Sequence, residues 1–256
     1  MRCSRPHGSA RRLPFSTLVI WSSSMTRARF LQIRKMRAPK VTLRAALAKE
    51  TSMVEKHIIS EFDKDLETIE AMIMKMGGLA EASIADATRS FESRDIPLVE
   101  AVIERDKLID ELEASINAQA VQVLALRSPN AVDLRLVLSV IKVSGNLERI
   151  GDYSKNMAKR TGMLLDLPDI ENAGSSLRRL GRKVELMLKD ALDAYIQRDP
   201  DLAEQVILQD SDVDQLYNGM FRQFLTYMME DPRNITACMH LHFIAKNIER
   251  MGDHVT

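Results

Sequence analysis

The chain has 256 residues, and its 36 Lys and Arg balance its 36 Asp and Glu, so the formal net charge is zero. This zero averages two different segments, because residues 1–50 carry 12 basic residues and one acidic residue, whereas residues 51–256 carry a net charge of −11. Cys3 and Cys238 are too few for a disulfide framework or a Cys-based zinc site, and they favour a reducing, intracellular compartment. No apolar run reaches the roughly 18 residues that a membrane-spanning helix needs, so we expect no membrane insertion.

The composition of the N-terminal segment predicts that this segment is an extension outside the folded body. It is rich in Arg and poor in acids, like a transit peptide, and helix-like periodicity begins only around Glu55. Met25, Met36 and Met53 are alternative start positions. We therefore interpret residues 1–52 as a basic, disordered or spurious extension, with a targeting segment and a functional basic arm as the alternatives.

Prolines divide the rest of the chain at intervals of 32 to 39 residues: Pro97, Pro129, Pro168, Pro200 and Pro232. Proline fits the first turn of a helix or a linker but not a helix interior, and apolar residues recur between the prolines at steps of three, four and seven. With aromatic residues at 5%, the composition also favours helices over a β-sandwich. We expect six helices, at residues 55–94, 97–127, 130–164, 172–198, 200–230 and 233–256.

The body contains an internal repeat. At a shift of 104 residues, 11 of the 27 positions from 86 to 112 are identical, and Asn146-x-Glu-Arg-x-Gly-Asp recurs at a shift of 101. The sequence therefore predicts an all-α fold of two tandem, similar three-helix bundles, at residues 55–165 and 171–256, in which consecutive helices are antiparallel neighbours. We expect Gly77-Gly78 to interrupt and bend the first helix. The last helix of the second copy, which ends at Thr256, is predicted to be shorter than its counterpart by about a turn.

The repeated polar residues form one pattern, in which an acid is followed four residues later by Asp. The pairs are Asp106/Asp110, Glu148/Asp152, Asp210/Asp214 and Glu249/Asp253. This spacing puts both carboxylates on one face of a helix, where they repel each other unless a cation is present. If the helices of each copy are antiparallel neighbours, four carboxylates converge, and such an all-oxygen set suits Mg²⁺, Mn²⁺, Ca²⁺ or iron.

Basic neighbours offer an alternative to metal: Arg105, Lys107, Arg149 and Arg250 are candidates to neutralise the same acids. Gly151 and Gly252 lie inside predicted helices, a choice explained by the close approach of another helix or of a ligand. His240 and His242 point to different sides of a helix and make a poor ligand pair. No Glu-x-x-His motif, nucleotide-binding loop or nucleophile motif is present, so we predict a chain that is not an enzyme.

Two segments carry a resemblance to a known family. Leu-Glu-Arg-Ile-Gly-Asp at 147–152 and Ile-Glu-Arg-Met-Gly-Asp at 248–253, joined to the acid pairs one helix earlier, resemble the PhoU family of phosphate-transport regulatory proteins. The resemblance covers about residues 57–256. It implies a cytoplasmic protein of two three-helix bundles, often a homodimer, that contacts no nucleic acid directly.

The resemblance also implies a function. Family members are negative regulators of phosphate uptake and of the phosphate-starvation response, and they link the ATPase subunit of the phosphate ABC transporter to a sensor histidine kinase. Multinuclear clusters of iron, manganese, magnesium or zinc bind to their acidic motifs. Carried over to this chain, the metal ligands are Asp106, Asp110, Glu148, Asp152, Asp210, Asp214, Glu249 and Asp253. The alternatives are a carboxylate-bridged metallohydrolase or oxidase and a metal-free helical scaffold.

Overall fold

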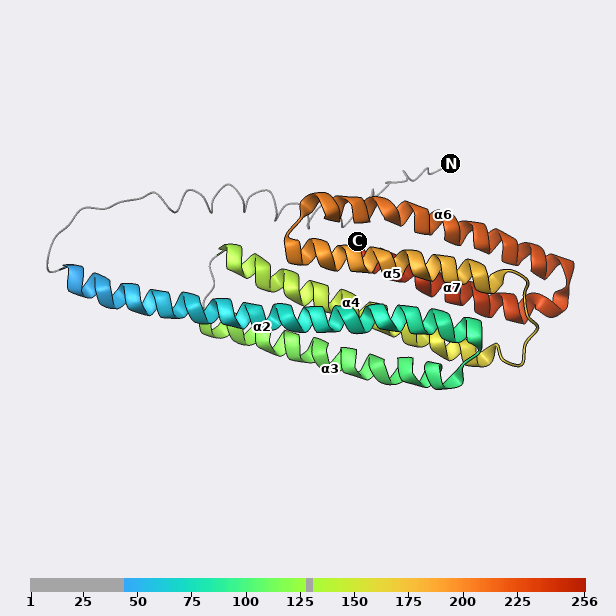
Figure 1. The fold of residues 1–256 in the computed structure, drawn as a ribbon, viewed down its shortest axis with the longest axis horizontal. Helices are drawn as coiled ribbons and strands as arrows, with labels where there is room; N and C mark the ends of the chain where they lie inside the picture. Colours follow the sequence, from blue (N-terminus) through green and yellow to red (C-terminus); the bar gives the residue numbers. More distant parts are fainter. Residues whose placement is uncertain (1–43, 128–130) are drawn as a thin grey trace, which may run out of the picture. The chain divides into compact units, whose positions relative to one another are not determined.

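The computed structural model of the chain describes residues 44–127 and 131–256, and every regular element in these ranges is helical (Figure 1). In chain order the elements are α2 (Arg44–Ser93), α3 (Ile96–Arg127), α4 (Ala131–Met163), α5 (Ala173–Gln197), α6 (Pro200–Glu230), the 3₁₀ turn η2 (Pro232–Asn234) and α7 (Ile235–Val255). The predicted all-α class is confirmed. None of the described helices is long and apolar enough to cross a membrane.

The prolines mark the helix boundaries as predicted. Pro97 is the second residue of α3, Pro200 is the first residue of α6, Pro232 opens η2, and Pro168 lies in the connection between α4 and α5. The position of Pro129 falls outside the described residues. Five of the six predicted helices therefore agree with the structure to within about two residues at each end, the margin by which helix assignments ordinarily differ.

The first helix differs from its prediction. It begins at Arg44 rather than near Glu55, so it includes the last nine residues of the predicted extension. Residues 44–56 are rich in Ala, Leu, Lys and Glu, which are strong helix formers even where they form no regular apolar stripe. The rest of the predicted extension lies outside the described residues.

Each copy turns from its first to its second helix in the same way. Arg94 and Arg198 both have a φ of 52°, in the left-handed region, and each is followed by an Asp. The Asp95 carboxylate accepts a hydrogen bond from the Leu98 backbone N–H at 3.2 Å, and the Asp199 carboxylate caps α6. The repeated Arg-Asp dipeptide is therefore explained by turn and capping chemistry.

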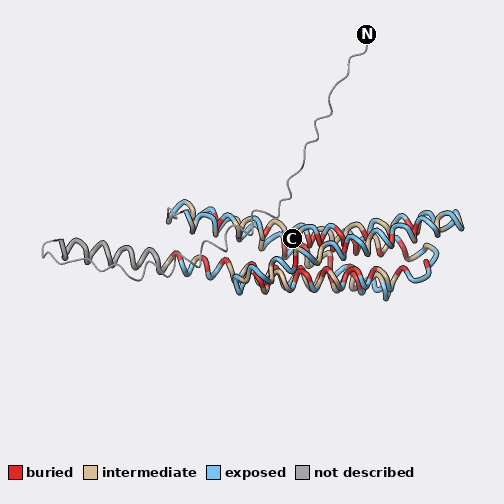
Figure 2. The backbone as a smooth tube through the Cα atoms, turned by 90° about the horizontal axis from the view of Figure 1, so that it is seen from above, coloured by how far each residue is buried: buried red, intermediate tan, exposed pale blue. Residues whose placement is uncertain are grey.

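The helices form two three-helix bundles that lie within one compact unit, Ala38–Thr256. The first bundle packs α2, α3 and α4 together, and the second packs α5, α6 and α7. The bundles meet where α2 packs against α5 and α4 packs against α7. The buried residues lie on the sides of the helices that face their neighbours (Figure 2). At the second seam the Tyr153 and His254 rings, which occupy equivalent places in the two copies, are 5.6 Å apart between centroids.

Gly77-Gly78 does not interrupt the first helix, so that prediction is wrong. Helix α2 is continuous through both residues. Gly77 instead lies where α2 packs closely against α5. A Cβ atom on Gly77 would lie 2.6 Å from Leu192 Cδ1. The same seam has a reciprocal contact, in which a Cβ on Gly181 of α5 would lie 2.5 Å from Thr88 Oγ1 of α2. Glycine therefore allows α2 and α5 to approach closely at two points.

Substitution of Gly181 tests this seam. We expect Gly181→Ala to lower the free energy of unfolding by about 1–2 kcal/mol, because Thr88 must move and its 2.8 Å hydrogen bond to the Ile84 carbonyl is disturbed. Gly78 is exposed and has no atom within 4 Å of its notional Cβ, so Gly78→Ala is expected to raise that free energy by about 0.5–1 kcal/mol. Urea unfolding of both variants measures the difference. Equal stabilisation of the two variants would show that the seam tolerates a methyl group.

Candidate functional site

The eight predicted acids lie on two pairs of adjacent, antiparallel helices. The first cluster consists of Asp106 and Asp110 on α3 with Glu148 and Asp152 on α4. The second cluster consists of Asp210 and Asp214 on α6 with Glu249 and Asp253 on α7. Because α3 packs on α4 and α6 packs on α7, each set of four gathers on one side of its bundle.

Asp106 is the buried member of the first cluster, with a side chain only 4% exposed. The Lys155 ammonium, one turn beyond Asp152, donates hydrogen bonds to Asp106 Oδ2 at 2.5 Å and to Asp152 Oδ1 at 2.6 Å. Burial lowers the pKa of Lys155, but these hydrogen bonds outweigh that effect and raise it above its usual value. Lys155 therefore stays charged and neutralises the buried carboxylate.

The other acids of the first cluster repel one another. Burial, followed by the charge of Asp106, raises the pKa of Asp110. Burial also raises the pKa of Glu148, and the Asp152 carboxylate adds to the increase both through its charge and through a hydrogen bond. One ammonium group is thus not enough to offset four neighbouring carboxylates.

In the second cluster the buried acid is Glu249, on the other helix of the pair. The Lys246 ammonium donates hydrogen bonds to both Glu249 carboxylate oxygens at 2.6 Å. Burial, the charges of Asp214 and Asp253, and then that of Glu249 raise the pKa of Asp210 to about 6. Burial is also the largest cause of the raised pKa of Asp253 and of Glu249.

The two lysines are not copies of each other. At the shift of 101 residues, Lys155 corresponds to Thr256 and Lys246 corresponds to Gly145. Each lysine is three residues from an acid of its own helix and pairs with the buried acid of its cluster. The repeat therefore keeps the acids at equivalent positions, whereas the lysine that pairs with them lies at a different position in each copy.

Sequence reasoning missed both lysines and proposed four other cations. Arg105 instead contacts Asp86 of α2 at 2.7 Å, and Lys107 pairs with Glu104 at 2.6 Å. Arg149 does lie near the first cluster, at 3.4 Å from Glu148 and 3.7 Å from Asp152. Arg250 lies over the Tyr153 ring, at 6.0 Å from its centroid, and its charge offsets part of the rise that burial causes in the pKa of Asp253, so it partly neutralises the second cluster as predicted. The spacing of three between Asp152 and Lys155, and between Lys246 and Glu249, was the signal that identifies the lysines.

Gly151 and Gly252 bring the paired helices together beside the acids, which confirms that their role includes close helix approach. A Cβ on Gly151 would lie 3.0 Å from Ile109 Cδ1 and 3.4 Å from Asp106 Oδ1. A Cβ on Gly252 would lie 3.2 Å from Asp210 Oδ1, the equivalent atom of the second copy. In both copies the glycine thus leaves space directly over a carboxylate oxygen.

The carboxylates of each cluster stand near one another without forming a closed cage. Within the described residues, no three Asp, Glu, His or Cys side chains are arranged closely enough to share a metal ion. Asp106 Oδ1 is buried and accepts no hydrogen bond, while its partner oxygen is held by Lys155. The metal-binding role of the eight acids therefore remains a prediction.

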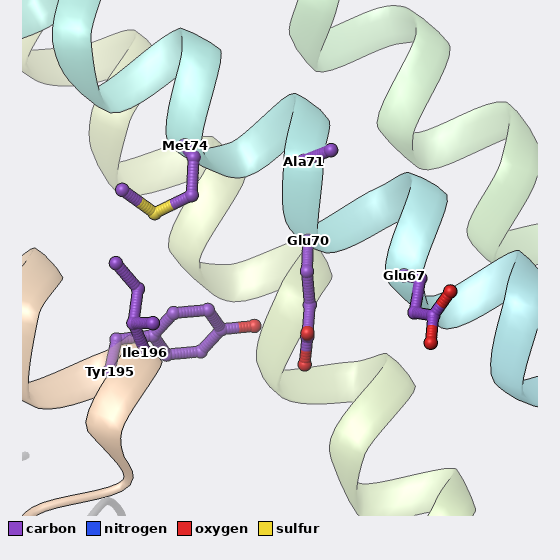
Figure 3. A pocket seen from close by; sticks show the side chains of 6 residues that line it. All are labelled: Glu67, Glu70, Ala71, Met74, Tyr195 and Ile196. Carbon is purple, nitrogen blue, oxygen red and sulfur yellow. The ribbon is translucent and has the colours of Figure 1, made fainter.

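A pocket of about 250 Å³ lies away from both clusters, where α2 meets the end of α5 (Figure 3). Its lining is mostly apolar and includes none of the eight acids: Glu67, Glu70, Ala71, Met74, Tyr195 and Ile196. Burial, and then the charge of Glu70, raises the pKa of Tyr195 to about 12, so its hydroxyl group stays protonated. The candidate site is therefore formed by the carboxylate clusters and is separate from this pocket.

The raised pKa of Asp210 predicts how stability changes with pH in metal-free buffer. An unfolded aspartate has a pKa of about 4, whereas that of folded Asp210 is about 6. The folded chain therefore holds this proton more tightly, and the free energy of unfolding falls as the pH rises from about 4 to about 6. Asp210→Asn removes the charge and is expected to reduce this fall and to raise the melting temperature at about pH 8.

Asp212 provides the matched control for this measurement. It is an exposed acid on the same helix that pairs with Lys183 at 3.0 Å, so Asp212→Asn is expected to leave the pH dependence unchanged. Thermal unfolding of wild type and both variants across this pH range gives the comparison. A melting temperature of Asp210→Asn below that of wild type at high pH would contradict the assigned repulsion.

Comparison with known proteins shows the family of the chain. The family model described as "PhoU domain" matches residues 73–161 and 177–256. A phosphate-specific transport system accessory protein PhoU homolog from Caulobacter vibrioides (strain NA1000 / CB15N) is 43% identical over 201 residues, which cover 78% of this chain and 87% of that protein. The accessory protein PhoU of Escherichia coli (strain K12) is 40% identical over 200 residues, covering 78% of this chain and 83% of that protein.

Solved structures agree with the sequence comparisons. The crystal structure of PhoU from Pseudomonas aeruginosa superposes with a TM-score of 0.74 at 36% identity, covering 76% of this chain and 93% of that one. PhoU from Streptococcus pneumoniae gives a TM-score of 0.70 at 26% identity, covering 76% of this chain and 91% of that one. The matched residues include both copies of the repeat and both carboxylate clusters. This chain belongs to the PhoU family.

Proposed function

We propose that this chain is an accessory regulator of phosphate transport that restrains phosphate uptake and keeps the phosphate-starvation response off when phosphate is plentiful. The observation that carries the proposal is the family match over both copies of the repeat, with both Glu-Arg-x-Gly-Asp segments inside it. The relatives at about 40% identity are named accessory proteins of the phosphate-specific transport system. A regulator of this kind acts through other proteins, for which long helices offer extended binding faces.

The finer part of the proposal concerns those proteins. We propose that the chain works in the cytoplasm as an adaptor between the ATPase subunit of the phosphate ABC transporter and a sensor histidine kinase. The strongly acidic body, with a net charge of −11 over residues 51–256, supports attraction to basic partner surfaces. The two bundles present similar but unequal surfaces, which suits the binding of two different partners.

A pull-down with the purified ATPase subunit and the kinase tests the adaptor role. We expect the full chain to capture both partners, and we expect conversion of the eight cluster acids to Asn or Gln to weaken capture of at least one partner by about tenfold. A variant with Glu104→Gln and Asp212→Asn controls for loss of surface charge, because both acids are exposed and belong to neither cluster. Failure of the wild-type chain to capture either protein would refute the adaptor role.

We further propose that each carboxylate cluster binds hard metal ions, in line with the family resemblance. The donors fit such ions, because all four groups of each cluster are carboxylates. Asp106 Oδ1 is buried and without a hydrogen-bond partner, and space beside it is kept open by Gly151. In the described structure the ammonium groups of Lys155 and Lys246 supply the positive charge that a metal ion would bring, so a metal ion and a lysine compete to neutralise the same carboxylates.

This competition gives a prediction for metal binding. We expect Lys155→Met to destabilise the metal-free chain by about 1–3 kcal/mol, because Asp106 is left buried without its partner. The same variant is expected to bind Mn²⁺ more tightly than wild type, so that added Mn²⁺ raises its melting temperature by the larger amount. Lys107→Met is the control, because Lys107 pairs with an exposed acid outside the cluster.

Thermal unfolding with and without Mn²⁺, together with elemental analysis of chain purified without chelator, measures both effects. The proposal predicts metal in the wild-type chain and its loss when the eight acids are converted to Asn or Gln. Equal stabilisation of wild type and Lys155→Met by Mn²⁺ would show that the lysine does not occupy the metal position.

A further inference from the structure

The second bundle carries an exposed apolar patch on two adjacent helices. Phe221, Leu225 and Met229 stand at steps of four on α6, and Ile235 and Met239 do the same on α7, with Phe243 following one turn later. All six are exposed, and Met229 is 85% exposed. Phe243 stands at the edge of the set, where the Arg160 guanidinium of α4 lies over its ring at 4.3 Å from the centroid. Single exposed hydrophobic residues are ordinary, but a contiguous set on a soluble protein marks an interaction surface. We call these six residues the α6/α7 patch.

The His242 ring joins the two helices at one end of the patch, between Phe221 of α6 and Phe243 of α7. The His242 ring lies 5.1 Å from the Phe221 ring and 5.9 Å from the Tyr217 ring, measured between centroids. Helices α6 and α7 are antiparallel, so one turn beyond the Phe221–His242 contact Leu225 of α6 is level with Met239 of α7. One further turn along, Met229 is level with Ile235.

The same face leads from the patch to the second carboxylate cluster. Lys246 lies 5.1 Å from the centroid of the Tyr217 ring and donates its hydrogen bonds to Glu249. On α6, the sequence positions Asp210, Asp214, Phe221 and Leu225 follow steps of four, seven and four residues, which keep side chains on one side of a helix. One face of α6 and α7 is therefore apolar at the end near η2 and acidic at the other end.

The first copy shows that this patch is not a simple product of duplication. Asn117, Ala125 and Lys142 occupy the positions of Phe221, Met229 and Phe243. The equivalents of Leu225, Ile235 and Met239 remain apolar and exposed, as Val121, Leu134 and Leu138. Among the described residues, the large aromatic members of the patch, Phe221 and Phe243, are therefore specific to the second bundle.

We propose that this face of the second bundle is a docking surface for an amphipathic helix of a partner protein, with large apolar residues along one side and basic residues at one end. The apolar side would lie on the α6/α7 patch, in the manner of a helix bound in a groove. The basic end would lie over the second cluster, where four carboxylates outnumber the Lys246 ammonium and the Arg250 guanidinium, so charge complementarity fixes the direction of the helix. The inference rests on the proposed accessory function in requiring a protein partner, but not on metal binding.

A synthetic probe tests the surface directly. The probe is a fluorescein-labelled helical peptide of about 18 residues, which matches a face about 27 Å long, with Leu at helical spacing on one side and Lys at one end. We expect saturable binding to the full chain that weakens as salt is added. A peptide of the same composition with the Leu residues scattered around the helix, and one with Glu in place of Lys, are both expected to bind at least about tenfold more weakly.

Matched variants locate the binding. Leu225→Ser with Met239→Ser is expected to weaken probe binding by about tenfold or more, because two central apolar contacts are lost. Val121→Ser with Leu138→Ser alters the equivalent exposed positions of the first copy and is expected to change binding less than about twofold. No saturable binding, equal binding of the scattered peptide, or equal weakening by both pairs of substitutions would overturn the proposal.

A photo-reactive phenylalanine at position 225 of the full chain identifies the occupant. The expected product is an adduct of the chain with the probe. Cross-linking to a second copy, or to residues 1–43 of the same chain, in place of the probe would overturn the proposal by showing another occupant. Probe binding without any effect of the chain on phosphate regulation would refute the proposed function alone. An effect of the chain on phosphate regulation without probe binding would refute the docking surface alone.

Discussion

The arrangement of both sites depends on one constraint, which is that a buried carboxylate needs a positive charge beside it. A glycine lets two helices approach closely beside the acids of each copy. In the first copy the buried acid, Asp106, is the one next to the glycine, whereas in the second copy the glycine lies next to Asp210 and the buried acid is Glu249. A lysine ammonium holds each buried acid. Burial and neighbouring carboxylates raise the pKa of Asp110 and Glu148 in the first cluster and of Asp210 and Asp253 in the second.

The two copies satisfy this constraint differently, which makes the sites unequal. The lysine follows the acids on α4 but precedes them on α7, so the positive charge lies at opposite ends of the two clusters along their helices. Asp210, the counterpart of Asp106, has no lysine partner among the contacts of the second cluster, and its pKa rises to about 6. The clusters should therefore differ in proton affinity, and metal ions that compete with these protons and ammonium groups should bind them with different strengths.

Much of this structure could be predicted from the sequence, because the features concerned are local. Proline positions and apolar periodicity located the helix starts, such as that of α6 at Pro200. The spacing of four placed Asp106 and Asp110 on one face of a helix. The role of Gly77 could not be predicted, because its partner Leu192 is more than a hundred residues away and belongs to the other bundle. Which acid becomes buried also depends on packing between helices, so the spacing that marks Lys155 as a partner of Asp152 does not reveal that Lys155, and not Arg105, pairs with Asp106.

Lys246 links the second cluster to the docking face, and this position couples the two proposals. Its ammonium group contacts Glu249 on one side and the Tyr217 ring on the other. A metal ion bound by Glu249 would take over the neutralisation of that carboxylate, and the basic end of a docked helix would compete for the same negative charge. Each cation would lower the favourable field available to the other, so the two proposals together predict a negative coupling between metal binding and helix docking. Linkage makes this coupling reciprocal: if metal weakens binding of the helix by some factor, the helix weakens binding of the metal by the same factor. Occupancy of the carboxylates would in this way control a protein contact through one lysine and one aromatic ring, without a change in the fold.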